Sequence, residues 1–450
     1  MTPDLEAQAM TATAGAPARI TAPSAVQPQD TALSLAPSAL GTPIASLPFT
    51  IDEPGHYYLI KTLAGVSGQH GIVIQAADVS LDLAGFSLTG VSGSLNGVRI
   101  ELSVQNVSIS NGIIRDWGGN GIASNFDYQA KVKLWNLRCV SNAGSGVGVG
   151  YVVAQSCEFS GNGAVGLTCN QEALLTDCYS ADNGSHGLIT GARSVVRGCI
   201  IRGNAGDGLR VGRGSVVGTC QSSGNAGDGV EVTNSGFAED GTVITDCVSS
   251  NNADSGLRGA ANTQVESCGF HNNNLMGLSL QSGSSARRCA ANSNDEGIVV
   301  TGFVTVQDCV ANGNATGIKA GPFAGIVGCQ AMGNTSTGIL MDSDSSVTSC
   351  NVASNDIFSG FGGIRVTGTR NTIERNSLFN DDLIVSGGSN VIVGNRLTGP
   401  GSLQVTSTAN TIFGNVLNNP TAAFSVVAGN DTAPTGTTAT ATNPWLNVLY

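Results

Sequence analysis

The sequence predicts an all-β solenoid, a single-stranded right-handed parallel β-helix with about 15 coils of roughly 21 residues each. Three observations predict it. Cysteines recur with a period of mostly 20 or 21 residues, asparagines recur at a fixed distance after them, and short segments alternate apolar and polar residues. A period of this length is too short for a two-helix repeat or a propeller blade, and alternation with period two is typical of strands.

The cysteine series is the clearest repeat. From Cys157 onward, an asparagine lies five residues after each cysteine of the series, and only Cys169 stands outside it. Eight or nine residues after most of these cysteines comes Gly followed by Leu, Ile or Val, as in Gly187-Leu188. Each repeat therefore carries the same residue types at the same places, as the turns of a solenoid do. The series consists of Cys139, Cys157, Cys178, Cys199, Cys220, Cys247, Cys268, Cys289, Cys309, Cys329 and Cys350.

A coil of three short strands and three turns accounts for the period. Equivalent residues of successive coils then lie about 4.8 Å apart, which is the spacing of paired strands. Asparagines stacked at this spacing bond one another through their amides, so we expect an internal asparagine ladder. The recurrent glycines are expected to supply turn conformations that other residues disfavour.

The cysteines are expected to be free, buried thiols. Parallel stacking keeps the Cβ atoms of successive cysteines about as far apart as the coils, which exceeds the roughly 3.5–4.5 Å of a disulfide. A metal site needs clustered thiolates, whereas this spacing gives a line. Cysteine then serves as a small apolar residue at a tight inward position.

Composition and charge exclude several classes of function. Charged residues make up 12% of the chain and the net charge is −12, which argues against non-specific binding to nucleic acids or anionic membranes. No run of 18 apolar residues is present, so we expect no membrane-spanning helix. The N-terminal residues contain no apolar segment typical of a signal peptide. The sequence leaves the oligomeric state open.

We expect three regions along the chain. Residues 1–45, rich in Ala, Pro, Thr and Ser, have the composition of a disordered leader. Residues 46–428 form the β-helix, in which residues 46–65 cap the first edge, and residues 429–450 form a Thr/Ala-rich linker and a C-terminal tail. The inner tryptophans, Trp117 and Trp135, are expected to be packing residues.

The Cys–Asn–Gly-Leu coils resemble the parallel β-helix repeats of the pectin-lyase-like superfamily. The first coils are most similar to a group of bacterial right-handed β-helix proteins. The matching segments are Leu47–Phe49, Pro54–Leu59, Val79–Leu83, Arg115–Gly119 and Asn443–Trp445. The superfamily includes lyases, hydrolases, epimerases and non-enzymatic surface proteins. The resemblance therefore implies a polysaccharide or a cell-surface glycan as partner, and an extracellular or cell-surface location.

The sequence departs from the catalytic patterns of that superfamily. The polygalacturonase pattern of Asn-Thr-Asp, Asp-Asp, Gly-His-Gly and Arg-Ile-Lys is absent, because Asp381-Asp382 stands without its partners. No catalytic residue is carried over from the resemblance. The activity has to be argued from this chain's own residues.

Departures from the 21-residue period mark loops, which carry function in rigid solenoids. Insertions at 124–130 and 235–240 leave the same corner of the solenoid five coils apart, so they can wall a groove about 24 Å long. They carry the aromatic candidates for ligand contact, Phe126, Tyr128 and Phe237. A third insertion lies at 357–362.

The residues between the first two insertions suggest an acidic-glycan site. Arg193, Arg210 and Arg213 can hold carboxylates, and Glu231 lies next to Arg210 on the outer face of the following coil. Asp207 and Asp228 fall on successive coils, so one of them can stay protonated as a general acid. A separation of about 5 Å suits a retaining mechanism, and His186 on the preceding coil can serve as base.

A structural interpretation competes with this one. Asp before Gly is favoured in tight turns, Arg210, Glu231 and Arg258 read as an outward charge ladder, and His186 can be a turn residue. Two functions therefore stay open: a non-catalytic surface or scaffold protein that binds glycan, and a lyase, hydrolase or epimerase of acidic polysaccharides. The sequence indicates no cofactor and no metal that folding requires. Ca²⁺ between acidic turns stays open, although no pattern in the sequence supports it.

Overall fold

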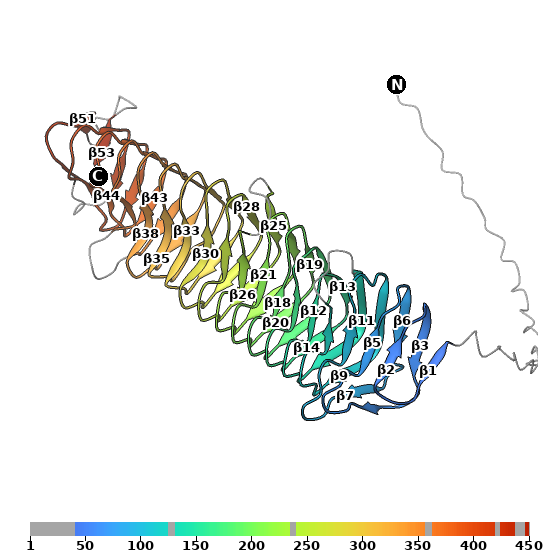
Figure 1. Ribbon diagram of the computed structural model, residues 1–450. Coiled ribbons are helices and arrows are strands. Elements are labelled where there is room, and N and C mark those ends of the chain that lie inside the picture. Colours follow the sequence, from blue (N-terminus) through green and yellow to red (C-terminus); the bar gives the residue numbers. More distant parts are fainter. Residues whose placement is uncertain are drawn as a thin grey trace, which may run out of the picture. The chain divides into compact units, whose positions relative to one another are not determined.

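Three stacks of short parallel strands make up the solenoid, and a typical coil contributes one strand to each stack (Figure 1). The computed structural model describes residues 41–124, 131–234, 240–355, 362–418, 424–436 and 446–449. A typical coil runs through β18 (Leu188–Ile189), β19 (Val195–Arg197) and β20 (Ile200–Arg202), and the next coil begins at β21 (Leu209–Val211). We call these stack 1, stack 2 and stack 3 in that order. Among the described residues no helix is long and apolar enough to cross a membrane.

Stack 1 carries the Gly-Leu/Ile/Val segments. Within the described ranges it contains 18 strands and hence 17 turns. This exceeds the expected 15 coils by two, and one of the additional turns comes from the segment assigned to a cap, whose strand β2 pairs with β5. The strands are β2 (Phe49–Ile51), β5 (Ile72–Ile74), β8 (Val98–Ile100), β10 (Ile122–Ala123), β12 (Val147–Val149), β15 (Leu167–Cys169), β18, β21, β24 (Val230–Val232), β27 (Leu257–Gly259), β30 (Met276–Leu280), β33 (Glu296–Val300), β35 (Thr316–Ala320), β38 (Thr337–Met341), β41 (Ile364–Val366), β44 (Leu383–Val385), β47 (Leu403–Val405) and β50 (Phe424–Val426).

Stacks 2 and 3 share two long strands, β9 (Val107–Arg115) and β11 (Lys131–Val140), which run through both. Stack 2 also contains β1 (Thr42–Ile44), β3 (Gly55–Leu59), β6 (Val79–Asp82), β13 (Tyr151–Gln155), β16 (Ala173–Thr176), β19, β22 (Val216–Gly218), β25 (Thr242–Thr245), β28 (Thr263–Glu266), β31 (Ser285–Arg287), β34 (Thr305–Gln307), β36 (Gly325–Val327), β39 (Ser346–Thr348), β42 (Thr372–Glu374), β45 (Val391–Val393), β48 (Thr411–Phe413) and β51 (Asp431–Thr432). Stack 3 also contains β4 (Leu63–Ala64), β7 (Ser87–Thr89), β14 (Glu158–Ser160), β17 (Tyr179–Ala181), β20, β23 (Gln221–Ser223), β26 (Val248–Ser250), β29 (Gly269–His271), β32 (Ala290–Asn292), β37 (Gln330–Met332), β40 (Asn351–Ala353), β43 (Ser377–Phe379), β46 (Arg396–Thr398), β49 (Val416–Asn418), β53 (Asn447–Leu449) and β52 (Thr435–Gly436).

Two corners with left-handed backbone enclose each strand of stack 3. In one coil they are Gly198 (φ 63°) and Gly203 (φ 64°), and in the preceding coil Asp177 (φ 52°) and Asp182 (φ 54°). Gly, Asp and Asn tolerate this conformation best. The cysteine follows the first of these corners and the ladder asparagine follows the second, so the chain turns sharply inward at both.

The asparagine ladder lies inside the second corner. Its members are buried, and each Nδ2 donates to Oδ1 of the asparagine in the next coil, as from Asn183 to Asn204 at 2.9 Å. The same Oδ1 accepts the backbone N–H of the preceding asparagine, at 3.2 Å for this pair. The bonds run in one direction from Asn142 to Asn355, and the last acceptor is the buried carboxylate of Asp381. The predicted ladder is confirmed.

Two further ladders occupy the C-terminal coils, and the sequence analysis missed them. One replaces the cysteines and runs through Asn376, Asn395, Asn415 and Asn447. The other lies at the entry to stack 2 and runs through Asn371, Asn390, Asn410 and Asn430. Because Asn447 opens β53, which pairs with β49, the end of the chain continues the same pattern.

All twelve cysteines are unpaired and buried, as expected for an inward column. Their thiols bond nearby carbonyl groups: Cys220 Sγ donates to the oxygens of Gly218 at 3.3 Å and of Val196 at 3.7 Å. Burial raises the pKa of Cys139 to about 12, which keeps this thiol protonated and unreactive at neutral pH.

The glycines at the start of the stack 1 strands have a different role from the one expected. Gly187, Gly208 and Gly277 are not among the residues with positive φ. A Cβ on Gly277 would instead lie 2.7 Å from the carbonyl oxygen of Gly297 and 2.7 Å from Nδ2 of Asn294. Successive coils approach so closely here that no side chain fits, so close packing selects glycine at this column.

Candidate functional site

The structure brings five of the predicted site residues into one group at the corner that precedes stack 1. His186, Asp207 and Asp228 lie two residues before β18, β21 and β24, and Arg210 and Glu231 lie in the middle of β21 and β24. The strands pair in register, so Arg210 is directly opposite Glu231. We call these five residues the corner cluster.

Backbone N–H groups of the following coil bind the three titratable residues at the corner. The N–H of Asp207 donates to His186 Nδ1 at 2.9 Å, the N–H of Asp228 donates to Asp207 Oδ1 at 2.8 Å, and the N–H of Ser255 donates to Asp228 Oδ1 at 2.9 Å. Non-titratable side chains do the same elsewhere at this corner, since Asn96 Oδ1 accepts the N–H of Asn120 at 2.8 Å. The side chains at this corner therefore have a structural role as hydrogen-bond acceptors, whether or not they can be ionised.

Arginines neutralise the carboxylates of the cluster. Arg210 Nε lies 2.5 Å from Glu231 Oε2 and 3.1 Å from Asp207 Oδ2, and its Nη1 lies 3.4 Å from His186 Nε2. Arg258 Nη2 lies 3.1 Å from Asp228 Oδ2. His186 Nδ1 also lies 3.3 Å from Asp207 Oδ2.

The two aspartates of the cluster titrate in opposite directions. Burial raises the pKa of Asp228 to about 6, against the opposing effects of the Ser255 N–H and Arg258, and with the negative charges of Asp207 and Asp254 adding to the increase. Burial also acts on Asp207, but the bonds from His186 and the Asp228 N–H, with the charge of Arg210, hold the pKa of Asp207 below its usual value. Asp228 is only 2% exposed, so its carboxyl has little access to a ligand.

The raised pKa of Asp228 predicts a pH dependence of stability. Between the usual value of 3.8 and about 6, the folded protein holds a proton that the unfolded chain has lost. The contribution of Asp228 is therefore complete below pH 3.8 and decreases as the pH rises through 6. As the pH rises over this range, we expect the free energy of unfolding of wild type to fall by about 3 kcal/mol relative to that of Asp228→Asn. Urea unfolding of both proteins measures it.

Asp207→Asn is the matched control, because the pKa of Asp207 is lowered. The stabilisation by Asp207 is present above the usual pKa of an aspartate and decreases as the pH falls below it. The difference in unfolding free energy between Asp207→Asn and wild type should therefore change only at acidic pH. If the unfolding free energies of wild type and Asp228→Asn differed by a constant amount from pH about 4 to about 6.5, the raised pKa of Asp228 would be contradicted.

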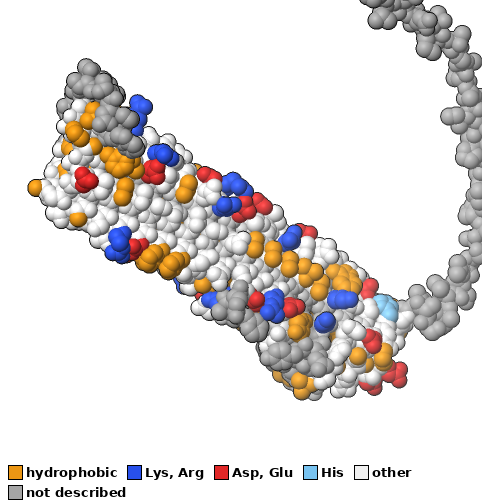
Figure 2. Space-filling view, turned by 90° about the horizontal axis from the view of Figure 1, so that it is seen from above, with side chains coloured by type: hydrophobic (Ala, Val, Ile, Leu, Met, Phe, Trp, Pro, Cys, Tyr) orange, Lys and Arg blue, Asp and Glu red, His pale blue; other side chains and the backbone are white. Residues whose placement is uncertain are grey.

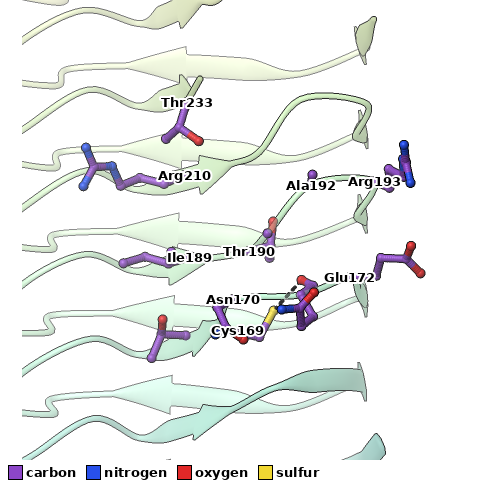
Figure 3. Close-up of a pocket in the computed structure, with 12 residues that line it drawn as sticks. Cys169, Asn170, Glu172, Ile189, Thr190, Ala192, Arg193, Arg210 and Thr233 are labelled. Atoms are coloured by element: carbon purple, nitrogen blue, oxygen red, sulfur yellow. Dashed lines mark hydrogen bonds between the residues drawn. The ribbon is translucent and has the colours of Figure 1, made fainter. Parts of the chain in front are cut away.

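A hollow of about 570 Å³ lies at the opposite corner, between stacks 1 and 2. Arg193 and Arg210 line it, together with Thr168 and Ile189 of stack 1 and Glu172 of the corner. Figure 3 shows Arg193 and Glu172 on one side of the hollow and the guanidinium of Arg210 on the other. Arg193 also pairs with Asp240, with Nη2 3.2 Å from Oδ2. Arg213 does not line the hollow, and its Nη2 donates to Asn234 Oδ1 at 2.8 Å.

Two further hollows continue this one across the face of stack 2. The second, of about 330 Å³, shares Glu172 and Arg193 with the first. The third, of about 510 Å³, shares Lys133 and Val153 with the second. We call the three together the basic groove. Figure 2, which looks down on this face, shows a row of hydrophobic side chains with basic side chains beside it.

The sequence analysis missed several residues of the basic groove. Lys131, Lys133 and Trp135 alternate with inward residues along β11 and point outward. Trp135 is 40% exposed, so its assignment to packing is wrong, whereas Trp117 is buried and its Nε1 donates to the oxygen of Leu88. The period-two alternation of residues 131–135 was the signal that could have identified all three.

Some predicted residues lie outside the described ranges. Phe126, Tyr128 and Phe237 fall within 125–130 and 235–239, so their relation to the groove remains a prediction. Within the part of the chain that is described, no group of three or more His, Cys, Asp or Glu residues is arranged to hold a metal ion.

Comparisons with known proteins concern the fold. A family model described as "Right handed beta helix region" matches residues 188–322. No curated protein matches the sequence.

The chain also matches solved structures at low sequence identity. The A-module of mannuronan C-5 epimerase AlgE4 from Azotobacter vinelandii is 16% identical, with 80% of this chain and 91% of that chain covered and a TM-score of 0.31. Pectate lyase Pel9A is 13% identical, with 72% and 71% covered and a TM-score of 0.25. These similarities carry no statement about activity. Together with the stacked strands, the family match identifies the chain as a right-handed parallel β-helix.

Proposed function

We propose that the protein binds an acidic polysaccharide in the basic groove and does so without catalysis. The observation that carries this proposal is the charge of the lining in a chain whose net charge is −12. The described part of the groove is lined by Lys131, Lys133, Arg193 and Arg210 and by one carboxylate, Glu172. The two arginines also pair with carboxylates outside the lining, so the two lysines contribute most of its positive charge. Carboxylates of a polyuronate or sulfates of a sulfated glycan are the natural counterparts of such a lining.

The apolar part of the groove supports a sugar ligand. Val153 and Leu174 are exposed on neighbouring strands and pair in register, and Tyr151 and Trp135 lie beside them. A pyranose ring has apolar C–H faces and a polar rim, so a lining of apolar floor and charged edge fits it. The lysines and arginines supply the charge themselves, and the proposed binding requires no metal ion or cofactor. A polysaccharide partner also favours an extracellular or cell-surface location.

The lysines provide the test. We expect the double variant Lys131→Ala/Lys133→Ala to bind oligogalacturonate or oligomannuronate about tenfold more weakly, since each exposed ion pair contributes up to about 1 kcal/mol. Calorimetric titration at low and high salt measures this, and salt should reduce the wild-type affinity. Arg396→Ala, on the exposed face of stack 3, is the matched control and should bind as wild type does. Equal affinity of the double variant and wild type would refute the proposal, as would equal binding of an uncharged glucan.

An enzyme of acidic polysaccharides is the second candidate, favoured by the opposite pKa shifts of Asp207 and Asp228. Two carboxyl groups with separated pKa values are the pattern of an acid and a base. Against it, both carboxylates bind backbone N–H groups and Asp228 is buried. The same glycans, incubated with the protein and followed for unsaturated or reducing-end products, separate the candidates. Turnover by wild type that Asp207→Asn abolishes would establish the enzyme and overturn the non-catalytic proposal.

A further inference from the structure

Two phenylalanine rings are exposed at the corner between stacks 1 and 2. Phe303 follows β33 and is 64% exposed, and Phe323 follows β35 on the next coil and is 48% exposed. Their ring centroids are 4.6 Å apart and their planes are inclined by 9°. The rings therefore lie face to face, one above the other along the solenoid. We call them the phenylalanine pair.

The backbone at this pair is unfavourable for phenylalanine. Phe303 has φ 50° and Phe323 has φ 60°, in the left-handed region that bulky residues rarely adopt. Gly283 (φ 76°) and Asp344 (φ 58°) occupy the same corner of the two neighbouring coils, and both types accept this conformation readily, although Arg370 (φ 59°) also adopts it at this corner. Exposure gives the two rings little stabilisation by burial. The fold thus gives no reason for phenylalanine here, which is typical of positions kept for binding.

The corner residues on either side of the pair are Gly283 on the preceding coil and Asp344 on the following coil. Gly283 has no side chain, and Asp344 pairs with Arg370, with Oδ1 2.6 Å from Nε.

A hollow of about 430 Å³ lies on the coils of the pair and on the two coils that follow. Thr301 and Gly321 line it, and each lies two residues before one of the phenylalanines. Lys319 and Asp342 supply its charged groups, and Lys319 Nζ lies 2.6 Å from Glu296 Oε1. An apolar platform beside a concave surface with a few polar groups is the usual composition of a small-ligand site.

We infer that the phenylalanine pair and this hollow form a second carbohydrate site, which takes one pyranose residue of a polysaccharide chain. The ring C–H face packs on the phenylalanine pair, and the hydroxyls bond Asp342 and the lysine in the hollow. The site lies on the same corner as Arg193 of the basic groove, five turns or about 24 Å away along stack 1. A long polysaccharide can then occupy both sites, and the second contact is intramolecular once the first has formed. The inference rests on the proposed function only for the class of ligand.

The test uses the full chain and saturation-transfer NMR with hexasaccharides of galacturonate, mannuronate and glucose, followed by titration of those that bind. Phe303→Ala/Phe323→Ala should lose affinity by about tenfold or more, whereas Phe379→Ala, an exposed phenylalanine on stack 3, should retain it. Phe303→Gly should lose affinity and also raise the melting temperature, because glycine relieves the left-handed backbone. The combination of weaker binding and higher stability excludes a mere loss of folding.

Three results would overturn the inference. The first is unchanged affinity in Phe303→Ala/Phe323→Ala, and the second is the absence of any binding by wild type. The third is that wild type forms a dimer in analytical ultracentrifugation and the double variant does not. The phenylalanine pair would then contact a second copy of the chain instead of a sugar. The two proposals can fail separately. If Lys131→Ala/Lys133→Ala binds as wild type does while the phenylalanine variants bind more weakly, the proposal for the basic groove is refuted and the proposal for this site stands.

Discussion

Asn273→Ala is expected to lower the free energy of unfolding by about 3–5 kcal/mol, because one substitution removes four buried hydrogen bonds. Asn273 Oδ1 accepts the backbone N–H and Nδ2 of Asn252, at 3.1 and 2.9 Å. Its Nδ2 donates to the oxygen of Ser249 at 3.2 Å and to Asn294 Oδ1 at 3.1 Å. Alanine leaves two donors of the preceding coil without an acceptor in a site that water does not reach.

Asn274→Ala is the matched control, because this neighbouring asparagine is exposed and its substitution should change stability by less than about 0.5 kcal/mol. Urea unfolding followed by circular dichroism measures both variants. Hydrogen exchange shows where the protein is destabilised. Because each coil of a solenoid contacts only its neighbours, the loss of amide protection should concentrate around residues 252–294. Equal midpoints for the two variants would show that the ladder contributes no net stability.

Gly277→Ala is expected to destabilise the solenoid by about 3 kcal/mol, although the substitution adds a single methyl group. The new Cβ would lie 2.7 Å from the oxygen of Gly297, 2.7 Å from Nδ2 of Asn294 and 2.8 Å from Cβ of Ala291. Two of these three atoms belong to the backbone or to a Cβ, so rotation of a side chain cannot relieve the overlap. The coils would have to separate, which breaks strand pairing in stack 1 and the asparagine ladder together.

Gly218→Ala tests the steric argument. Gly218 lies in β22, has no positive φ, and a Cβ there would meet its nearest atom, Thr245 Oγ1, at 3.5 Å. Alanine should therefore be neutral or slightly stabilising, because it restricts the unfolded chain. Melting temperatures of the two variants give the comparison. A similar loss in both would mean that strand glycines are required for another reason.

The fold could be predicted from the sequence because one residue type recurs at one place in every turn. The cysteine series gave the column of thiols, and the asparagines gave the ladder from Asn162 to Asn355. The role of Gly187, Gly208 and Gly277 could not be predicted, because backbone conformation and close packing both select glycine. The C-terminal ladders were missed because Asn376 and Asn395 occupy the place that cysteine holds in earlier coils.

The candidate site was predictable only in part. Period-two alternation correctly placed Arg210 and Glu231 on the outer face, and stacking placed them side by side. The contacts of His186 and Asp207 could not be predicted. A side chain that precedes Gly at this corner can either point into a cleft or accept a hydrogen bond from the backbone of the next coil. The hollows depend on how three coils meet at a corner, and no spacing in the chain encodes their volume.

The one-way bonds of the long asparagine ladder have an electrostatic consequence. Every side-chain amide from Asn142 to Asn355 points its N–H towards the same end of the solenoid, so their dipoles add as peptide dipoles do in a helix. The positive pole of this array meets Asp381, whose carboxylate accepts the final N–H groups. A negative charge at a positive pole is stabilised, as at the N-terminus of a helix. Asp381 therefore neutralises the array where it ends, although it lies deep inside the protein.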